Sequence, residues 1–471
     1  MVVKKLTPVF WVMTVVFLAW ACALTYKYIN LGFDNWDFAF FNQSFWNLTQ
    51  GHQYSSIFGY NFLGDHASYG AFLILPFYAV FPSPLTLLYV KAAAFAVSLY
   101  FLYLIAREKL GDKGALLMTI LFSFFVPNSF AMLYEFSFEC FAPLFIFMMF
   151  YAHRKDDLRL FWIAAVCLCL TKENLILVVM AFGVYGLFQR RSFAWTWGIL
   201  IFALLTLALA MISVKYFRGG EGVSAWLRYK HLFVSPQALQ QYFFSAENGR
   251  FWQELSGPFF GLAFLPSVPL WLGIPVFLQH TLSIHVTEHR IFYFYAFALT
   301  PFIFIAGIDA LARVRARLGR LIYVSLLAVV TTGCLLGIVC YEKMLMRRIG
   351  YLNAKEVHDR WALIQNIPPS ASVVASFDVL VPLSSRASIY PFYKVFNKKF
   401  QDLAIARNTE FAMGRLFELP RDVAYALIDL DDPWMDHSID EQRRVDAFLS
   451  QGWCVLYQRG TLRLLHRQVE K

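Results

Sequence analysis

The chain has 471 residues, of which 59% are hydrophobic and only 15% are charged. A soluble globular protein of this size is less apolar, so the composition predicts an integral membrane protein. The formal charge of +10 does not indicate a nucleic-acid partner, because the lysines and arginines lie in short clusters beside apolar segments, as the positive-inside rule expects.

The first apolar segment, 6–26, follows Lys4 and Lys5 and contains Ala21-Cys22-Ala23, so a cleaved signal peptide has to be considered. Its apolar core is longer than that of a signal peptide, which favours an uncleaved helix. Most of the seven cysteines lie inside apolar segments, and they show neither a disulfide framework nor metal-ligand spacing.

With the N-terminus in the cytoplasm, a helix over about 8–28 places the loop 29–83 on the outer face. Within that loop, aromatic residues of 36–47 recur at roughly helical spacing, which predicts an amphipathic helix in the membrane interface. The apolar stretch 71–81 is too short to span and is bracketed by Pro76 and Pro82, so we expect it to be interfacial or re-entrant.

Further membrane segments, which cross the membrane in alternating directions, are predicted at 84–106, 114–131, 138–152, 159–171, 173–189, 193–215, 291–311 and 321–341. Residues 257–280 contain four prolines, and we expect a broken hairpin there that enters and leaves on the outer side. If residues 257–280 crossed the membrane only once, the basic cluster 313–320 would lie on the outer side. The fold class is thus an α-helical polytopic membrane protein of about eleven segments, counting the hairpin as two.

The membrane domain is expected to comprise residues 1–344, and residues 345–471 a small extracytoplasmic α/β domain. Its predicted strands are 372–376, 423–430, 453–457 and 461–465, and its predicted helices are 354–365 and 440–449.

This topology gathers many polar residues at the outer face of the membrane domain. They are Asp34, Asp37, Asp65, His66, Glu135, Glu139, Lys172, Glu173, His285, Glu288 and His289. Any one of them could belong to an ordinary solvated turn. Those that abut apolar helices favour a functional reading, because a charge there is costly unless it is paired or used.

Such a set can perform chemistry at a lipid boundary. A carboxylate can deprotonate a hydroxyl nucleophile, a cation can neutralise a lipid phosphate leaving group, and Asp and His side chains can hold Mg or Mn. Asp37, Asp65 and His66 are the candidate metal ligands. No nucleotide-binding motif occurs, and the cytoplasmic turns are too short for a nucleotide-binding domain, so no nucleotide is expected.

Five motifs resemble the DUF2079 family of predicted membrane proteins, which groups with the GT-C superfamily of polyprenyl-phosphate-dependent glycosyltransferases. They are Trp36–Asn47, Asn61–His66, Leu85–Leu87, Thr171–Glu173 and Ile367–Val373. The resemblance covers nearly the whole chain and implies a GT-C-like arrangement.

By this resemblance, Asp37 matches the acidic residue after the first helix that GT-C enzymes use as base or metal partner. The chain departs from the family pattern at Ala39, Asn42 and Ser137, and near Phe294 and Tyr295 an expected histidine is missing. Losing possible ligands at 42 and 137 weakens the expectation of a metal ion.

The resemblance implies sugar transfer from a polyprenyl-phosphate-linked donor on the outer face of the inner (cytoplasmic) membrane, with that donor and membrane lipid as partners. Two alternatives stay open: a lipid or solute transporter or flippase, and a non-catalytic assembly or sensor protein. The expected catalytic residues are Asp37 and Glu139, and the expected substrate-binding residues are Asp65, His66, Lys172, Glu173, Gln43 and His289.

Overall fold

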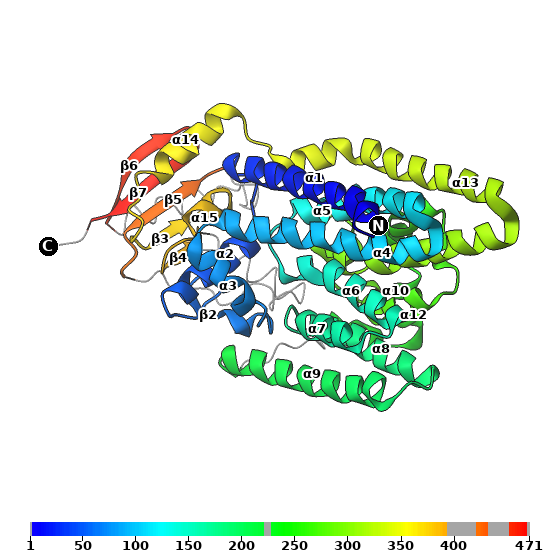
Figure 1. The fold of residues 1–471 in the computed structure, drawn as a ribbon. Helices are drawn as coiled ribbons and strands as arrows, with labels where there is room; N and C mark the ends of the chain where they lie inside the picture. The colour runs from blue at the N-terminus through cyan, green and yellow to red at the C-terminus, as the bar shows by residue number, and fades with distance from the viewer. Residues whose placement is uncertain (1, 221–227, 393–420, 432–451, 469–471) are drawn as a thin grey trace.

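The computed structural model describes residues 2–220, 228–392, 421–431 and 452–468. A bundle of long helices makes up most of the molecule, and a mixed sheet lies at one end of it (Figure 1). By length and composition, four helices of the described residues can cross a membrane: Thr7–Ile29, Pro84–Ser123, Phe193–Phe217 and Thr300–Ile364.

The bundle consists of helices of unequal length. They are α1 (Val2–Ile29), α4 (Pro84–Ser123), α5 (Val126–Leu133), α6 (Ala142–Lys155), α7 (Leu158–Cys169), α8 (Ile176–Phe188), α9 (Trp197–Phe217), α10 (Pro236–Phe243), α11 (Ala246–Ser256), α12 (Val268–Thr281) and α13 (Thr300–Ile349). Short 3-10 helices connect them: η2 (Phe138–Phe141), η3 (Glu173–Leu175), η4 (Phe193–Trp195), η6 (Lys230–Phe233), η7 (Gly257–Phe259), η8 (Leu262–Phe264), η9 (Val286–His289) and η10 (Phe294–Ala298).

The two longest helices, α4 and α13, each consist of two helical legs joined at a glycine. Gly111 has φ 76° and Gly319 has φ 88°, a left-handed backbone conformation that only glycine adopts without strain. The legs correspond to predicted segments, and in Figure 1 α13 turns back at the far end of the bundle. Both breaks lie in basic sequence, and Arg315 Nη1 donates to the carbonyl of Leu110 at 3.5 Å. We call this the basic end of the bundle.

The proline-rich stretch after α11 forms the broken hairpin that the sequence predicts. The chain passes through η7 and η8 instead of a regular helix. It reaches the basic end at Pro266, whose carbonyl accepts from Arg313 at 3.1 Å. Helix α12 then returns to the opposite end, where Gln279 accepts from Asn174 at 3.3 Å. We call that opposite end the site end.

The loop between α1 and α4 covers the site end. It holds α2 (Trp36–Thr49), β1 (Tyr54–Ser55), β2 (Tyr60–Asn61), η1 (Phe62–Gly64) and α3 (Ala71–Val80). Helix α2 lies where it was predicted, but the prediction that one of its faces is exposed and polar is wrong. Phe38–Phe45 is buried without interruption, because α3 and the C-terminal helix α15 (Phe377–Leu383) pack against it.

The C-terminal region contains a five-stranded mixed sheet in the order β4-β3-β5-β7-β6. The strands are β3 (Val373–Ala375), β4 (Ile389–Pro391), β5 (Tyr425–Asp429), β6 (Trp453–Arg459) and β7 (Leu462–Arg467). Strand β3 is parallel to β4 and β5, and β7 is antiparallel to β5 and β6. The four predicted strands coincide with β3, β5, β6 and β7, and the helix predicted at 354–365 is α14 (Ala354–Ile364). The helix predicted at 440–449 lies outside the described residues.

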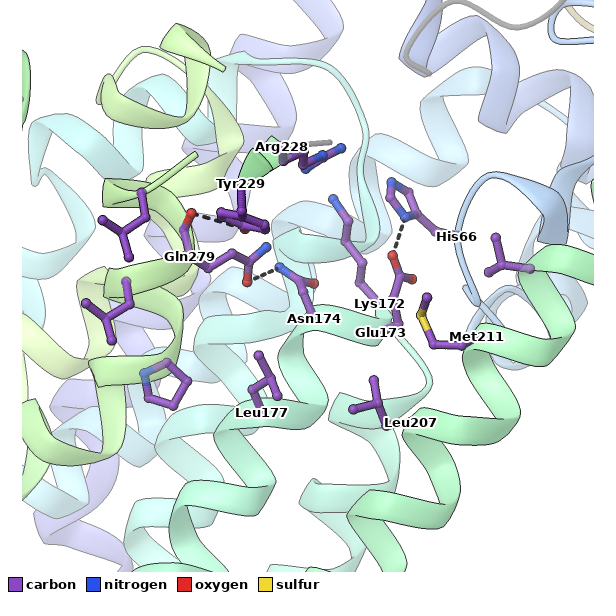
Figure 2. Close-up of a pocket in the computed structure, with 14 residues that line it drawn as sticks. His66, Lys172, Glu173, Asn174, Leu177, Leu207, Met211, Arg228, Tyr229 and Gln279 are labelled. Carbon is purple, nitrogen blue, oxygen red and sulfur yellow. Dashed lines mark hydrogen bonds and ion pairs between the residues drawn. The ribbon is translucent and has the colours of Figure 1, made fainter. Parts of the chain in front are cut away.

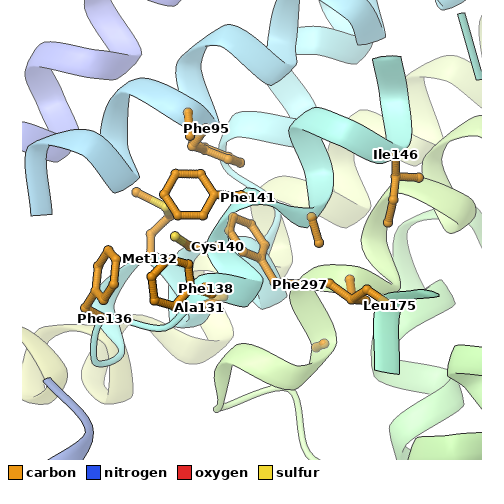
Figure 3. Packing of buried hydrophobic residues seen from close by; sticks show 14 of the residues in the cluster. Phe95, Ala131, Met132, Phe136, Phe138, Cys140, Phe141, Ile146, Leu175 and Phe297 are labelled. Carbon is orange, nitrogen blue, oxygen red and sulfur yellow. The ribbon is translucent and has the colours of Figure 1, made fainter. Parts of the chain in front are cut away.

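Aromatic side chains fill the core beneath the site end (Figure 3). Phe136 and Phe138 flank Ser137, with ring centroids 5.6 Å apart, and Phe95 packs on Phe297 at 5.5 Å. Each large ring that is buried away from water stabilises the fold by about 1.5–3 kcal/mol. The backbone of 134–142, which carries two buried glutamates, is therefore held in one position.

Candidate active site

A cavity of about 420 Å³ opens at the site end between α8, α9 and α12. Its lining is polar at one end and apolar at the other, and Figure 2 shows His66, Lys172 and Arg228 apart from Leu177 and Leu207. The lining residues are His66, Lys172, Glu173, Asn174, Leu177, Leu207, Met211, Val214, Arg228, Tyr229, Pro275, Leu278, Gln279 and Leu282. A ligand with a charged head and an apolar body suits such a lining.

Lys172 enters the cavity from the turn between α7 and α8. Its Nζ donates to Glu139 Oε1 at 3.1 Å and lies 5.5 Å and 5.6 Å from the ring centres of Phe294 and Tyr295. Glu139 is only 1% exposed, and it is not among the residues that line the cavity. The carboxylate therefore holds the ammonium group in place, while Lys172 itself reaches the cavity.

His66 lies between two carboxylates. Its Nδ1 is 2.8 Å from Glu173 Oε1, and its Nε2 is 3.7 Å from Asp65 Oδ2. The N–H of Ala67 donates to the second oxygen of Glu173 at 3.2 Å. Burial acts to raise the pKa of Glu173, but the charge and hydrogen bond of His66, with the charge of Lys172, outweigh it and lower this pKa to about 2. Glu173 is thus ionised at neutral pH.

Asp37 has the opposite electrostatic environment. It stands in the first turn of α2, after the N-cap Asn35, whose side chain accepts from the N–H of Trp36 at 2.7 Å. Burial, and then the negative charge of Asp65, raise the pKa of Asp37 to about 7 against the opposing charges of Lys172 and His66. Asp37 is half-buried beside the cluster and is not itself part of the cavity lining. A carboxyl group with this pKa can exchange a proton near neutral pH.

A buried lysine supports the backbone next to Asp37. Lys91 Nζ donates to the carbonyls of Ala131, Tyr134 and Glu135 at 2.9, 3.0 and 3.1 Å. The side chain of Glu135 in turn accepts from the N–H of Phe38 at 3.1 Å, and burial raises the pKa of Glu135 to about 8. Helix α2 is thereby fixed to the segment that carries Glu139.

The three candidate metal ligands do not fit a cation site. Among the described residues, no group of three or more His, Cys, Asp and Glu side chains is arranged to hold a metal ion. The Nδ1 of His66 is already engaged by Glu173 Oε1 at 2.8 Å, which leaves only Nε2 of this ring to bind a cation. We derive no step through a metal ion.

The sequence matches a known family model over most of its length. Residues 27–458 match the family model described as a predicted membrane protein (DUF2079). The chain belongs to the DUF2079 family. No match was found among curated proteins.

This DUF2079 chain shares its fold with ArnT. The crystal structure of ArnT from Cupriavidus metallidurans bound to undecaprenyl phosphate aligns with a TM-score of 0.52 at 13% identity, covering 96% of this chain and 97% of ArnT. The apo structure of the same enzyme aligns with a TM-score of 0.53 at 12% identity, with the same coverage. The protein is therefore a mostly helical membrane protein with an ArnT-like fold.

Six of the residues predicted for the site of this DUF2079 protein lie together: Asp37, Asp65, His66, Glu139, Lys172 and Glu173. Gln43 lies elsewhere. It is fully buried and bonds Ser55, Ser56 and the carbonyl of Ala387, so it attaches α2 to the C-terminal region.

His289 also lies away from the cavity lining. Its Nδ1 is 2.6 Å from Asn248 Oδ1 and its Nε2 is 2.6 Å from the carbonyl of Ser283. Both ring nitrogens are thus occupied, and the ring connects α11 with the loop that follows α12.

Sequence reasoning did not select Arg228 for the site. Its Nη1 is 2.8 Å from Glu288 Oε1, and Glu288 also lies 3.2 Å from His280 Nδ1. The following residue, Tyr229, donates to the carbonyl of Gln279 at 3.2 Å. The polar stretch that carries Arg228 has no periodic pattern, so only its basic charge on the outer side could have indicated this role.

Proposed function

We propose that this protein is a membrane glycosyltransferase that transfers a sugar from a polyprenyl-phosphate carrier to an acceptor at the site end. The observation that carries the proposal is the cavity with cations at its polar end and an apolar wall leading away from them. The fold of ArnT, whose structure is known with undecaprenyl phosphate bound, supports the same reading.

The apolar wall extends well beyond the cavity. A second cavity of about 660 Å³ lies along α8 and α12, and Leu177 and Pro275 line both. Its other lining residues are almost all apolar, among them Val184, Phe188 and Trp271. We call it the apolar trough. A phosphate beside Lys172 and Arg228 can thus have its isoprenoid tail along the apolar wall of the trough.

The residues of the cluster take distinct roles in the proposed reaction. Asp37 accepts the proton of an acceptor hydroxyl, whose oxygen forms a bond to the anomeric carbon of the sugar. The bond between that carbon and the phosphate oxygen breaks, and the electron pair leaves with the polyprenyl phosphate. Lys172 and Arg228 stabilise the negative charge on this leaving group. Glu139 acts as a positioning residue for Lys172.

We place the reaction on the extracytoplasmic side of the inner membrane. The basic end would face the cytoplasm by the positive-inside rule, which puts the site end and the C-terminal region outside. Membrane segments of this proposed topology number about eleven.

The lipids that co-purify with the protein test this function. We expect mass spectrometry to find polyprenyl phosphate, free or glycosylated, bound to the native protein. The intact glycosylated carrier should be enriched on the Asp37→Asn variant, because this variant binds the donor but cannot activate the acceptor. Lys172→Gln should lose the lipid, and Arg317→Gln, an exposed change at the basic end, should retain it. A polyprenyl lipid absent from the native protein and from Asp37→Asn would contradict the proposal.

A further inference from the structure

A second polar cavity lies at the basic end, across the bundle from Lys172. It has a volume of about 360 Å³ and is enclosed by residues of α4, α6, α8, α12 and α13 and of the turn after α8. Its charged and polar lining includes Lys109, His153, Arg154, Arg191 and Asp309. It shares no lining residue with the candidate active site.

The charges around this cavity leave positive groups in excess. Arg154 Nη2 pairs with Asp309 at 3.1 Å, and Arg191 Nη1 pairs with Asp156 at 3.1 Å. Lys109 forms no ion pair within the described ranges of the chain. With both carboxylates already neutralised, the cavity carries a net positive charge.

Two polar atoms at this cavity are enclosed and unsatisfied. Neither Arg154 Nη1 nor His153 Nε2 has a hydrogen-bond partner in the described part of the protein, although His153 is only 8% exposed. A buried donor without a partner costs about 1–3 kcal/mol, and more when it is charged. Both residues line the cavity, so an anionic group bound there lies beside them.

The cavity continues into the apolar trough. Tyr185, Val268 and Leu272 line both. Phe188, which lines the trough next to the basic end, is 82% exposed. A ligand that enters here meets cations and enclosed donors first and an apolar channel next.

We infer that the cavity at the basic end binds a phospholipid with an anionic headgroup. Its phosphate lies against Arg154, His153 and Lys109, and one acyl chain follows the trough past Phe188. A soluble phosphate would use the donors but leave the trough unfilled. This inference does not depend on the glycosyltransferase proposal, because its charged groups, Arg154, His153 and Lys109, do not line the candidate active site. Its acyl chain uses the same trough that the proposal gives to the isoprenoid tail.

The test is lipid binding in nanodiscs of phosphatidylcholine that contain a minor fraction of phosphatidylglycerol. Native mass spectrometry of the protein released from the discs counts bound lipids of each kind. We expect the native protein to retain phosphatidylglycerol in preference to phosphatidylcholine. Arg154→Gln and Lys109→Gln should each weaken this preference about tenfold, the effect of one charge-assisted hydrogen bond.

Lys109→Gln separates loss of binding from loss of folding, because Lys109 is exposed and its replacement leaves no ion-pair partner behind. Arg317→Gln is the matched control at the same end: it removes one positive charge outside the cavity and should leave the preference unchanged. Equal losses in Lys109→Gln and Arg317→Gln would indicate general surface attraction and overturn the inference.

Inorganic phosphate separates the two possible sources of the anion. We expect added phosphate at millimolar concentration to leave the retained phosphatidylglycerol in place and Phe188→Ala to reduce it. Displacement by phosphate, with no effect of Phe188→Ala, would identify a soluble-anion site and overturn the lipid assignment.

Discussion

The bundle contains one lysine–glutamate pair at each end, and the two pairs differ in burial. At the site end, Lys172 and Glu139 are 3.1 Å apart, with side chains 9% and 1% exposed. At the basic end, Lys155 and Glu108 are 2.5 Å apart, with side chains 49% and 29% exposed. The shorter pair is the weaker one, because water screens its charges and solvates either partner when the pair is broken. The buried pair has no such alternative.

The same contrast extends to the groups around each pair. Ionisable residues at the site end are enclosed together, so burial and neighbouring charges drive the pKa of Asp37 and of Glu173 in opposite directions. Two carboxyl groups of the same cluster thus differ in protonation because of what surrounds each of them. The following experiments test this contrast from the largest expected effect to the smallest.

Asp37→Asn should abolish transfer while the protein remains folded. General-base catalysis contributes about 10²–10⁴-fold to a rate, so we expect a loss of that size in the release of polyprenyl phosphate from glycosylated carrier. Asp34→Asn, a change in the same loop at a half-buried position, is the control and should keep most of the activity. A fully active Asp37→Asn protein would remove Asp37 from the mechanism.

Lys172→Gln should lower thermal stability strongly, because it leaves Glu139 buried without its partner. Breaking a buried pair costs about 3–5 kcal/mol, and we expect a clear fall in Tm in detergent. The double variant Lys172→Gln, Glu139→Gln should recover part of this loss, since no buried charge then remains unpaired. Equal Tm values for the single and double variants would show that the pair is not the cause.

Activity should rise with pH through about 7, where Asp37 loses its proton and becomes a base. The stability contribution has the opposite sign: the folded protein holds this proton more tightly than the unfolded chain, so the contribution of Asp37 falls as pH rises from about 4 to about 7. Asp37→Asn should flatten the dependence of Tm on pH over this range. An activity that does not change between pH 6 and pH 8 would contradict the raised pKa.

Glu173 contributes stability with the reverse dependence on pH. Its lowered pKa means that the contribution is present above about 4.5 and is lost as pH falls toward about 2.

Lys155→Gln should change stability least. The pair with Glu108 is exposed, and exposed ion pairs contribute about 0–1 kcal/mol. We expect a shift in Tm close to the error of measurement, and a smaller one still at high salt. A loss as large as that of Lys172→Gln would refute the comparison between the two ends.

Local signals in the sequence predicted much of this structure. Hydropathy and the positions of the basic clusters located the helical legs on either side of Gly111 and Gly319, and prolines indicated the broken hairpin before α12. Alternating apolar residues indicated four of the five strands. These features depend on neighbours in the sequence, which is why they could be read from it.

Contacts between distant segments were harder to predict. Gln43 was expected to bind substrate, but its partners include the carbonyl of Ala387, more than 300 residues away. Lys91 gave a signal that was missed: a lysine inside an apolar segment needs partners there, and it finds them at the end of α5. Arg228 reaches the cavity through the fold of the loop around it, which no periodic pattern encodes.

The burial of α2 has a mechanical consequence. Asp37 lies in the first turn of this helix, and Asn42, less than two turns further along, donates to Ser384 Oγ at 2.8 Å. A helix of this length moves as a stiff rod, so a shift of the C-terminal region is transmitted to Asp37 over a lever arm of about 7 Å. A ligand that displaces the C-terminal region would therefore displace Asp37 as well.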